Sequence, residues 1–410
     1  MRADLRGSAE KLTLAAALAS IGYTAFAVTR MRAFGRRMHR DTATGELGDT
    51  ARPSVTVLKP VHGVEPGLEE NLRSFCAQEY PAYDVVLGVH RADDPALEVI
   101  GRVAAAFPDR TTVAVGDGVA RFRNPKIANL AGMLAHARGD VLLIADADMR
   151  VTPDYLDAVV APFADPRVGA VTAIYRGEAA DDTLASALGA MWITEQFAPS
   201  ALVACALQPL AHAFGATMAV RRDVFDAIGG LSALGDRLAD DHALGKLVSE
   251  HGRTVALAAY AVENVVAERS VRALLQHEVR WARTIRSVRP ASYPGIVLTY
   301  PVPLSLLHLA VARRKKRAFA LALAAVLARL ALRATARRAL GTRKRTAMRL
   351  VPLRDALGIA VWALGLFGSA VRWRDAELHV TARGDLFTPS SDSTAPRGNL
   401  SAPSGDSEAP

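Results

Sequence analysis

The chain has 410 residues, half of them hydrophobic, and 50 lysines and arginines against 41 aspartates and glutamates give a formal net charge of +9. This length accommodates two or three domains, and two cysteines, Cys76 and Cys205, without metal-ligand spacing exclude a disulfide framework and fit a reducing compartment. The basic clusters, residues 313–317 (RRKKR) and 333–354, flank apolar segments without interleaved aromatics, which argues against nucleic acid and favours anionic lipid headgroups.

Apolar segments lie near both ends of the chain. A membrane-spanning helix needs about 17–25 apolar residues, so the first segment is long enough and the other three are borderline. Arginines 30, 32, 36, 37 and 40 come directly after the first segment. By the positive-inside rule they place the adjoining C-terminal part of the chain in the cytoplasm, which favours a retained anchor over a cleaved signal peptide. The four segments are residues 12–29, 296–312, 318–332 and 356–371.

The part of the chain after residue 53 alternates between strand-like and helix-like segments. This alternation predicts an α/β domain with a mostly parallel sheet covered by helices on both faces. Ligands of such sheets bind at the carboxyl ends of the strands. The predicted strands are residues 54–61, 84–90, 112–117, 140–146 and 168–177, and the helices between them include residues 67–78, 95–107 and 124–138.

Two carboxylates follow the buried strand 140–146, in the sequence DVLLIADAD. Asp146 and Asp148 would repel each other at such a strand end unless a cation lay between them. A DxD pair can hold Mg²⁺ or Mn²⁺, which share their remaining ligand positions with phosphate oxygens. By itself the motif is weak, because a solvated turn has the same sequence.

Two further acidic pairs are candidate site residues, one after a predicted strand and one at the start of a predicted helix. Asp93 and Asp94, in ADDPA, follow the second predicted strand. Asp240 and Asp241 begin the amphipathic helix of LADDHALGKLVSEHG. Acidic residues at a helix start are often only caps stabilised by the helix dipole. The functional interpretation is a general base for an acceptor hydroxyl.

The sequence QHEVRW begins a basic and aromatic region, residues 271–293, that joins the predicted domain to the later apolar segments. Gln276 and Arg280 are four residues apart and share a helix face, and Trp281 adjoins them. An arginine fork suits phosphate, and tryptophan suits a membrane interface. Arginines 283, 286 and 289 come next at threefold spacing; they are expected to meet lipid phosphates, unless they form only a solvated basic face.

Taken in order, DD, DAD, ADD and QHEVRW resemble the D, DxD, D and (Q/R)xxRW pattern of membrane-bound inverting glycosyltransferases with a GT-A fold. LKPVHGVEPGLEENL, DDPALEV, NPKIANL, FGATMAVRRDVFDAIGGL and LADDHALG resemble ceramide glucosyltransferases, glycosyltransferase family 21. The resemblance covers about residues 54–290. HEVRWARTIRSVRP looks most like bacterial members, including those associated with hopanoid synthesis.

The resemblance implies a donor site for a UDP-sugar. In it, Asp94, with Asp93 beside it, would help to hold the uridine. Asp146 would lie at the nucleotide and the metal, and Asp148 would complete the DxD pair. Lys126, in NPKIANL, would reach a phosphate, although a lysine at a helix start is as often a surface residue.

The resemblance also implies an acceptor side. Asp241 would be the base, and Asp240 its acidic neighbour. Gln276, Arg280 and Trp281 would engage the diphosphate and shape the acceptor pocket at the membrane.

The chain departs from the animal members in two places. Those members carry a histidine before the proline in the stretch that matches QFAPSAL, where this chain has Ala198 before Pro199. The DxD pair is fuller than the Asp-Ser-Gly of the animal enzymes, which favours direct metal binding. The histidines show no zinc spacing and are expected on the surface or in packing.

The leading hypothesis is transfer of a hexose, glucose first, from a UDP-sugar to the hydroxyl of a ceramide-type membrane lipid, with inversion in one displacement. The alternative within the same class is transfer of N-acetylglucosamine to a hopanoid polyol (bacteriohopanetetrol). More distant alternatives are a processive polysaccharide synthase, for which the apolar segments look too few, and a non-catalytic lipid-binding scaffold, against which the intact acidic motifs argue.

The sequence predicts a multi-pass membrane protein, in the bacterial inner membrane if the bacterial likeness holds, with a cytoplasmic catalytic domain and two to four crossings. If residues 296–312 crossed outward, RRKKR would lie outside the cell, against the positive-inside rule. Either this segment is re-entrant or interfacial, or the side chains of the cluster snorkel to a membrane interface. The expected parts are an anchor (1–29), a basic and polar linker (30–53), the GT-A domain (54–270), an interfacial segment (271–293), a C-terminal membrane region (294–372) and a tail (373–410), disordered from about residue 388.

Overall fold

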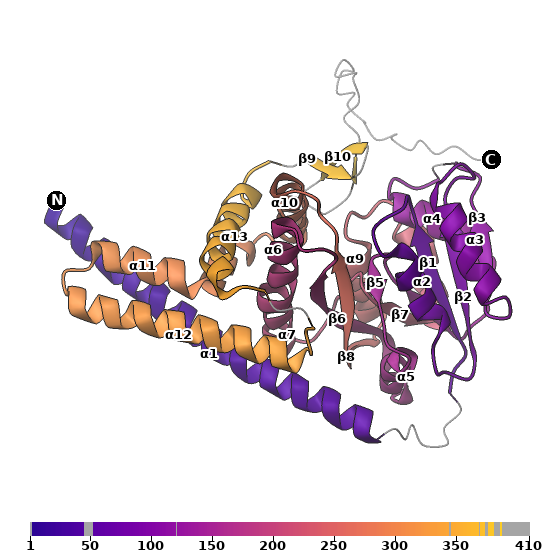
Figure 1. The fold of residues 1–410 in the computed structure, drawn as a ribbon, viewed down its shortest axis with the longest axis horizontal. Helices are drawn as coiled ribbons and strands as arrows, with labels where there is room; N and C mark the ends of the chain where they lie inside the picture. The colour runs from indigo at the N-terminus through magenta and orange to yellow at the C-terminus, as the bar shows by residue number, and fades with distance from the viewer. Residues whose placement is uncertain are drawn as a thin grey trace, which may run out of the picture.

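The computed structural model shows the α/β GT-A-like fold that the sequence predicts, with long apolar helices from both ends of the chain packed beside it (Figure 1). The structure describes residues 2–44, 52–119, 121–343, 346–368, 370–373, 376–380 and 386–387.

An eight-stranded sheet with the order β3-β2-β1-β4-β7-β6-β8-β5 forms the centre of the domain. Strands β1, β2, β3 and β4 run parallel, as do β6 and β8, so the prediction of a mostly parallel sheet is confirmed. Strand β7 runs antiparallel to both of its neighbours. The strands are β1 (Val55–Val61), β2 (Tyr83–Val89), β3 (Thr111–Val115), β4 (Val141–Ile144), β5 (Met149–Arg150), β6 (Val168–Ala179), β7 (Met218–Arg221) and β8 (Thr254–Val266).

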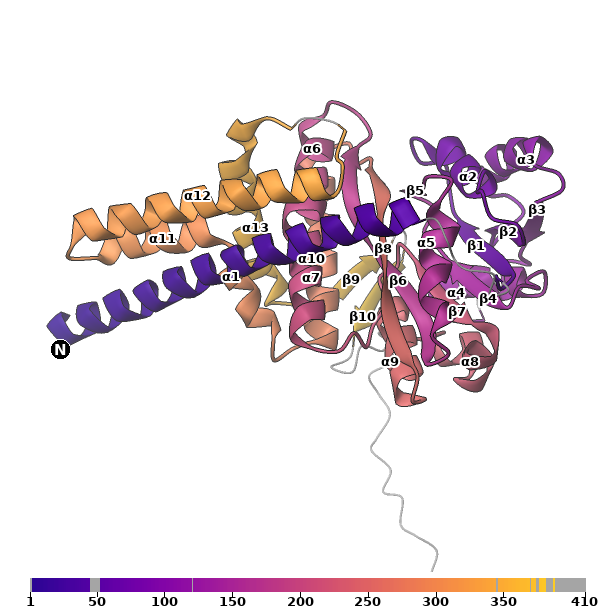
Figure 2. The same cartoon turned by 90° about the horizontal axis from the view of Figure 1, so that it is seen from below.

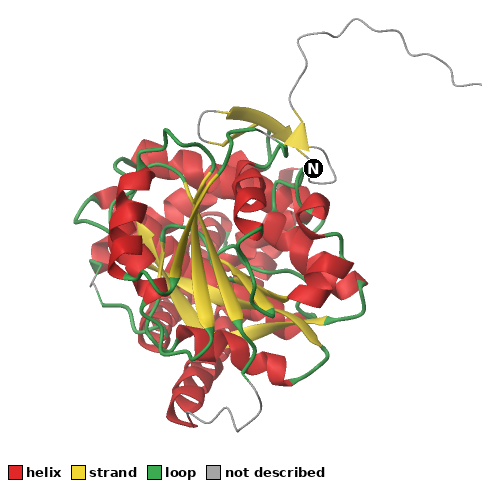
Figure 3. Cartoon of the chain, turned by 90° about the vertical axis from the view of Figure 1, so that its right-hand side faces the viewer, coloured by secondary structure: helices red, strands yellow, loops and turns green. Residues whose placement is uncertain are grey.

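Helices cover both faces of this sheet (Figure 3). Each of the four side chains of β4 is buried, as expected for a strand with both faces covered. One apolar core lies under α2 (Leu68–Cys76), α3 (Ala96–Ala106) and α5 (Tyr155–Val160). The other lies under α4 (Pro125–Leu134), α8 (Arg222–Ala227) and α9 (Asp240–Glu250).

A layer of helices lies between much of the sheet and the long apolar helices (Figures 1 and 2), although the N-terminal long helix also contacts β8 directly. It contains α6 (Leu184–Trp192), a π-helical turn (Ile193–Phe197) and α7 (Ala198–Leu207), which follow one another. Helix α10 (Val271–Val288) packs against α6 and against α13 (Val351–Gly365). We call these helices the crosswise layer, because they run across the direction of the long helices.

Three helices form a bundle beyond this layer: α1 (Arg2–Thr44), α11 (Pro301–Val311) and α12 (Lys315–Ala339). The turn between α11 and α12 lies at the same end as the N-terminus (Figure 1). There the backbone N–H of Arg313 donates to Glu10 at 3.0 Å, and Thr13 hydrogen-bonds His308 at 3.1 Å. At the other end Gly35 of α1 meets Ala339 of α12 so closely that a Cβ on Gly35 would lie 2.9 Å from the Ala339 Cβ.

Two helices in the described part of the chain are long and apolar enough to cross a membrane, α1 over residues 6–40 and α12. The 3₁₀-helix Tyr293–Thr299 and α11 meet at a bend of 83°, and together they form a third crossing only if the bent pair counts as one span. Helix α11 alone is roughly 16 Å long, too short to cross. The bend agrees with the expectation that residues 296–312 form no simple span.

Helix α1 continues through Thr44, so the first part of the expected linker is helical. Two sequence-based expectations differ from the structure. The apolar segment 356–371 lies largely in α13, which packs on α10 and is no candidate span. Arg333 and Arg354 are buried in ion pairs with Glu195 and Glu278, and so cannot meet lipid headgroups as the basic stretch 333–354 suggested.

The RRKKR cluster is exposed, as a headgroup-binding cluster must be. A small sheet of β9 (Ala370–Trp373), β10 (Ala376–Val380) and β11 (Leu386–Phe387) spans the boundary between the expected membrane region and the expected tail. The disorder expected from about residue 388 falls outside the described residues.

Candidate active site

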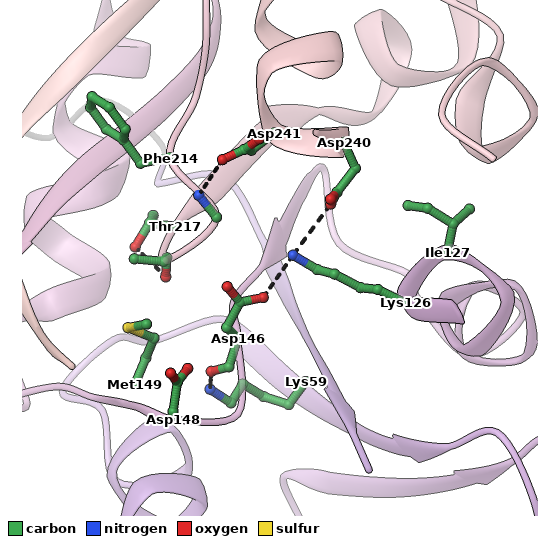
Figure 4. A network of polar contacts seen from close by, with 12 residues as sticks. Lys59, Lys126, Ile127, Asp146, Asp148, Met149, Phe214, Thr217, Asp240 and Asp241 are labelled. Carbon is green, nitrogen blue, oxygen red and sulfur yellow. Dashed lines mark hydrogen bonds and ion pairs between the residues drawn. The ribbon is translucent and has the colours of Figure 1, made fainter. Parts of the chain in front are cut away.

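Charged side chains from four parts of the fold meet beyond the carboxyl end of β4 (Figure 4). The Lys126 ammonium lies between two of the sequence-predicted carboxylates, 2.7 Å from Asp146 and 3.3 Å from Asp240. Asp241, next in sequence, accepts a hydrogen bond from the backbone N–H of Gly215 at 3.0 Å. The DxD and ADD motifs therefore belong to one site, although nearly one hundred residues separate them.

Lys126 is placed by the start of α4. The Asn124 side chain caps this helix by accepting from the backbone N–H groups of Lys126 (2.9 Å) and Ile127 (3.4 Å). Burial alone would lower the pKa of Lys126, but the charges of Asp146 and Asp240 outweigh it and raise the pKa above its usual value. Lys126 is thus a buried, fixed cation and not the surface lysine that its position in the sequence also allowed.

Asp148 faces the other side of the DxD motif. Its carboxylate accepts from the Asn264 amide at 2.7 Å. Burial raises the pKa of Asp148 to about 7, and the negative charges of Asp146 and Glu65 act in the same direction. Two carboxylates whose charges are incompletely compensated, with hard oxygen donors, fit Mg²⁺ or Mn²⁺. Among the described residues no group of three or more His, Cys, Asp or Glu side chains could hold a metal alone, so phosphate oxygens or water molecules would complete its shell.

Lys59 is a site residue that the sequence did not reveal. It lies fully buried in β1, 3.8 Å above the Phe75 ring, and its ammonium donates to the backbone carbonyl of Asp146. Burial lowers the pKa of Lys59 to about 7, against the opposing effect of Asp148 and Asp146. The signal was a single cation within the apolar strand SVTVLKPV.

Asp241 is a buried carboxylate held by backbone donors. Its two carboxylate oxygens accept from the backbone N–H groups of Gly215 (3.0 Å) and His242 (2.7 Å), and the turn at Gly215 brings it towards Asp146. Burial raises the pKa of Asp241 to about 7, and the charge of Asp240 acts in the same direction. A Cβ on Gly215 would lie 3.0 Å from the Asp146 carboxylate and 3.7 Å from that of Asp241, so the backbone at Gly215 lies close to both carboxylates.

Asp94 and Asp93 differ sharply in the structure. Asp94 is buried and accepts from the backbone N–H groups of Gly63 and Ala96, both at 2.9 Å, while its second oxygen pairs with His62 at 2.9 Å. It therefore ties the loop after β1 to the start of α3. Asp93 is exposed and pairs with Arg91 at 2.8 Å on the surface.

Helix α10 brings part of the QHEVRW motif to the site. Trp281 stacks on Trp192 with ring centroids 5.2 Å apart. It also lines a cavity of about 260 Å³ that reaches Asp148. Gln276 is exposed and Arg280 half-buried, and neither is among the residues that line this cavity.

Comparison with known proteins identifies the family. Residues 12–386 of this chain match the family described as "Glycosyl transferase family 21". Among curated relatives, ceramide glucosyltransferases 1 and 3 of Caenorhabditis elegans are 24% and 23% identical over 255 residues, 62% of this chain. A ceramide glucosyltransferase of Gibberella zeae is 29% identical over 143 residues, 32% of this chain and 27% of its own. The chain spans about half the length of the two nematode relatives, 53% and 54%.

A solved structure of similar extent is a mannosyltransferase from Pyrobaculum calidifontis in complex with GDP-Man and Mn²⁺. It is 23% identical, covers 86% of this chain and 99% of its own, and has a TM-score of 0.47.

Proposed function

The chain belongs to glycosyl transferase family 21. We propose that it transfers a hexose from a UDP-sugar to the hydroxyl of a ceramide-type membrane lipid and inverts the anomeric carbon. Glucose is the leading candidate for the hexose. The observation that carries this proposal is the placement of Asp241 beside Asp146, separated only by the Gly215 turn. A base near the DxD pair is what a single displacement at a sugar carbon requires.

The donor side of the proposed reaction rests on charge. Bound Mg²⁺ or Mn²⁺ would neutralise the diphosphate and stabilise the departing UDP. Asp146 and Asp148 would hold the ion. Lys126, already held between two carboxylates, would hold Asp146 in place and add positive charge near the phosphates. Lys59 would hold the backbone of the DxD motif in place by donating to the Asp146 carbonyl.

The acceptor side rests on Asp241. With a pKa near 7, it exists partly as the carboxylate at neutral pH and can take the proton of a hydroxyl as that oxygen attacks. The two backbone N–H groups on its oxygens fix its orientation. The crosswise layer lies between this site and the apolar bundle, which suits an acceptor that stays in the membrane (Figure 1).

The test uses the full chain in lipid nanodiscs with UDP-glucose or UDP-N-acetylglucosamine and either ceramide or a hopanoid polyol. Mass spectrometry identifies the product, and a polymeric product would point instead to a polysaccharide synthase. Chelator should abolish turnover, and Mg²⁺ or Mn²⁺ should restore it. Asp148→Ala should weaken donor binding. Full activity of this variant without divalent metal, or absence of any sugar transfer or donor hydrolysis by the wild type, would overturn the proposal.

A further inference from the structure

The cavity beside Trp281 connects the metal motif with the crosswise layer. Asp148 and Asn264, at the sheet edge, line one side of it. Ile193 of the π-helical turn and Leu274 and Trp281 of α10 line the other. The cavity therefore extends from the proposed reaction centre to the helices that face the apolar bundle.

Resting on the function proposed above, we infer that this cavity receives the acceptor's headgroup, and that Glu268, oriented by His277, is a specificity-determining residue that accepts a hydrogen bond from a neutral, hydroxyl-bearing headgroup. Glu268 follows β8 and His277 lies on α10, and both line the cavity. Their side chains meet at 2.6 Å between His277 Nδ1 and Glu268 Oε1.

The second oxygen of Glu268 needs a hydrogen-bond donor. Glu268 Oε2 is buried and has no hydrogen-bond partner among the described residues. A buried acceptor without a partner is costly, and the cost disappears when a ligand hydroxyl donates to it. Gly189 lies beside this oxygen: a Cβ there would be 3.9 Å from Oε2, so the glycine leaves that side of the oxygen uncrowded.

The charge of the cavity selects against anionic headgroups. Besides Asp148, which the proposed metal would neutralise, Glu65 and Glu268 contribute carboxylates to its wall, and neither lysine nor arginine is among the described residues that line it. Glu278 also lines it, but its carboxylate is bound on both oxygens by Arg354 at 2.7 and 2.8 Å. Like charges in contact disfavour binding, so a phosphate headgroup should be rejected where a diol is accepted.

Two short-chain probes test the inference on the full chain in nanodiscs: 1-O-octylglycerol, a neutral diol, and octyl phosphate, an anion with the same tail. Tryptophan fluorescence reports binding, because Trp281 lines the cavity. The diol should bind and the phosphate should not. Glu268→Ala should weaken diol binding roughly 10- to 100-fold, as expected for loss of a hydrogen bond to a charged group. Glu268→Lys should reverse the preference between the probes.

Controls separate this inference from the proposed function. Glu250→Gln, a matched carboxylate paired with Lys246 at 3.7 Å on α9, should leave diol binding unchanged. His277→Ala should weaken diol binding less than Glu268→Ala, since it loosens Glu268 without removing the acceptor. UDP affinity, measured by calorimetry, should stay within about twofold in the Glu268 variants.

Unchanged diol binding in Glu268→Ala, or loss of UDP affinity in its place, would overturn the assignment of the cavity to the acceptor. Failure of the wild type to bind UDP would instead overturn the proposed function.

Discussion

Asp94 and Asp241 show how surroundings give one residue type different chemistry. The Asp94 carboxylate is bound by two backbone N–H groups and His62, so its hydrogen-bonding capacity serves the loop and helix around it. Asp241 is equally well held, but it lies beside Asp240 in a buried cluster, and its pKa is raised to about 7. A carboxylate that gains and loses its proton near neutral pH suits general-base catalysis.

Asp241→Asn keeps the shape of the side chain but cannot accept the acceptor's proton. We expect kcat to fall by roughly 10²- to 10⁴-fold, with UDP affinity nearly unchanged because the base faces the acceptor. The pH profile gives a second readout. Below a pKa of about 7 the base is protonated and inactive, so kcat/KM of the wild type should rise as pH increases through 7, and the variant should lose this dependence.

Asp165→Asn is a suitable control, because Asp165 is partly exposed and pairs with Arg167 away from the site. It should retain wild-type turnover. If Asp241→Asn instead lost UDP affinity and kept its turnover rate at saturation, the base would be misassigned.

The sequence predicted individual site residues where a motif places charge at a strand end or helix start. Asp146 and Asp241 were found in this way, and the structure brings them together. Lys59 and Gly215 were missed because their roles depend on contacts across the sheet. The single lysine in β1 was a usable signal, but an isolated glycine gives none until its neighbours are known.

At the scale of elements, α10 joins the site to the membrane-side helices. Its Trp281, His277 and Glu278 line the cavity, and Glu278 is also buried against Arg354 of α13. A second buried network binds Arg329 and Arg333 of α12 to Glu195 of the π-helical turn. The Gln276–Arg280 spacing predicted that these two residues share a helix face. The ion-pair partners lie 76 and more than 130 residues away, so local patterns could not reveal them.

Arg354→Met should destabilise the protein by roughly 3–5 kcal/mol, because it leaves the Glu278 carboxylate buried and unpaired. The double variant Glu278→Leu/Arg354→Met should recover most of that loss. Thermal unfolding in detergent measures both. Arg102→Gln, which removes an exposed partner of Glu98, should cost at most about 1 kcal/mol. A double variant no more stable than Arg354→Met would contradict this account.

The arginines after QHEVRW already have protein partners. Arg283 donates to the Phe367 carbonyl at 3.1 Å, Arg286 to that of Gly368, and Arg289 contacts His212 at 3.1 Å. We still predict that changing all three to glutamine raises KM for a bilayer acceptor, and leaves donor hydrolysis nearly intact. The substitutions would also remove the hydrogen bonds from α10 to the backbone just after α13, and this loss could raise KM as well. If the triple variant kept wild-type kinetics on anionic vesicles, these arginines would have no role in docking to lipid phosphates.

At the scale of the whole molecule, the RRKKR turn lies beside the start of α1, and the catalytic domain lies at the other end of the bundle (Figure 1). A membrane crossed by α1 and α12 would therefore place RRKKR opposite the catalytic domain and require residues 296–312 to cross as a bent pair, against the sequence-based expectation. The hydropathy pattern identified α1 and α12, but the number of crossings could not be predicted. The 83° bend before α11 and the packing of α13 on α10 depend on tertiary contacts.

We predict that Lys316 and the N-terminus are accessible from one side of the membrane and Glu98 from the other. Lys316→Cys and Glu98→Cys, in a background without Cys76 and Cys205, can be labelled in intact cells with a membrane-impermeant maleimide. Only the first should react before permeabilisation. Reaction of both, or of Glu98→Cys alone, would show that the bundle does not cross the membrane in this way.

The close contact between Gly35 and Ala339 also bears on how the protein is made. Helix α1 leaves the ribosome long before α12, with 270 residues between Thr44 and Lys315. At about 5–20 residues per second this interval lasts roughly 15 to 50 seconds. During that time the α1 face that will pack on α12 must be covered by lipid or by a biogenesis factor. The nascent catalytic domain can fold while tethered only by α1, and the bundle can close only after α12 has been made.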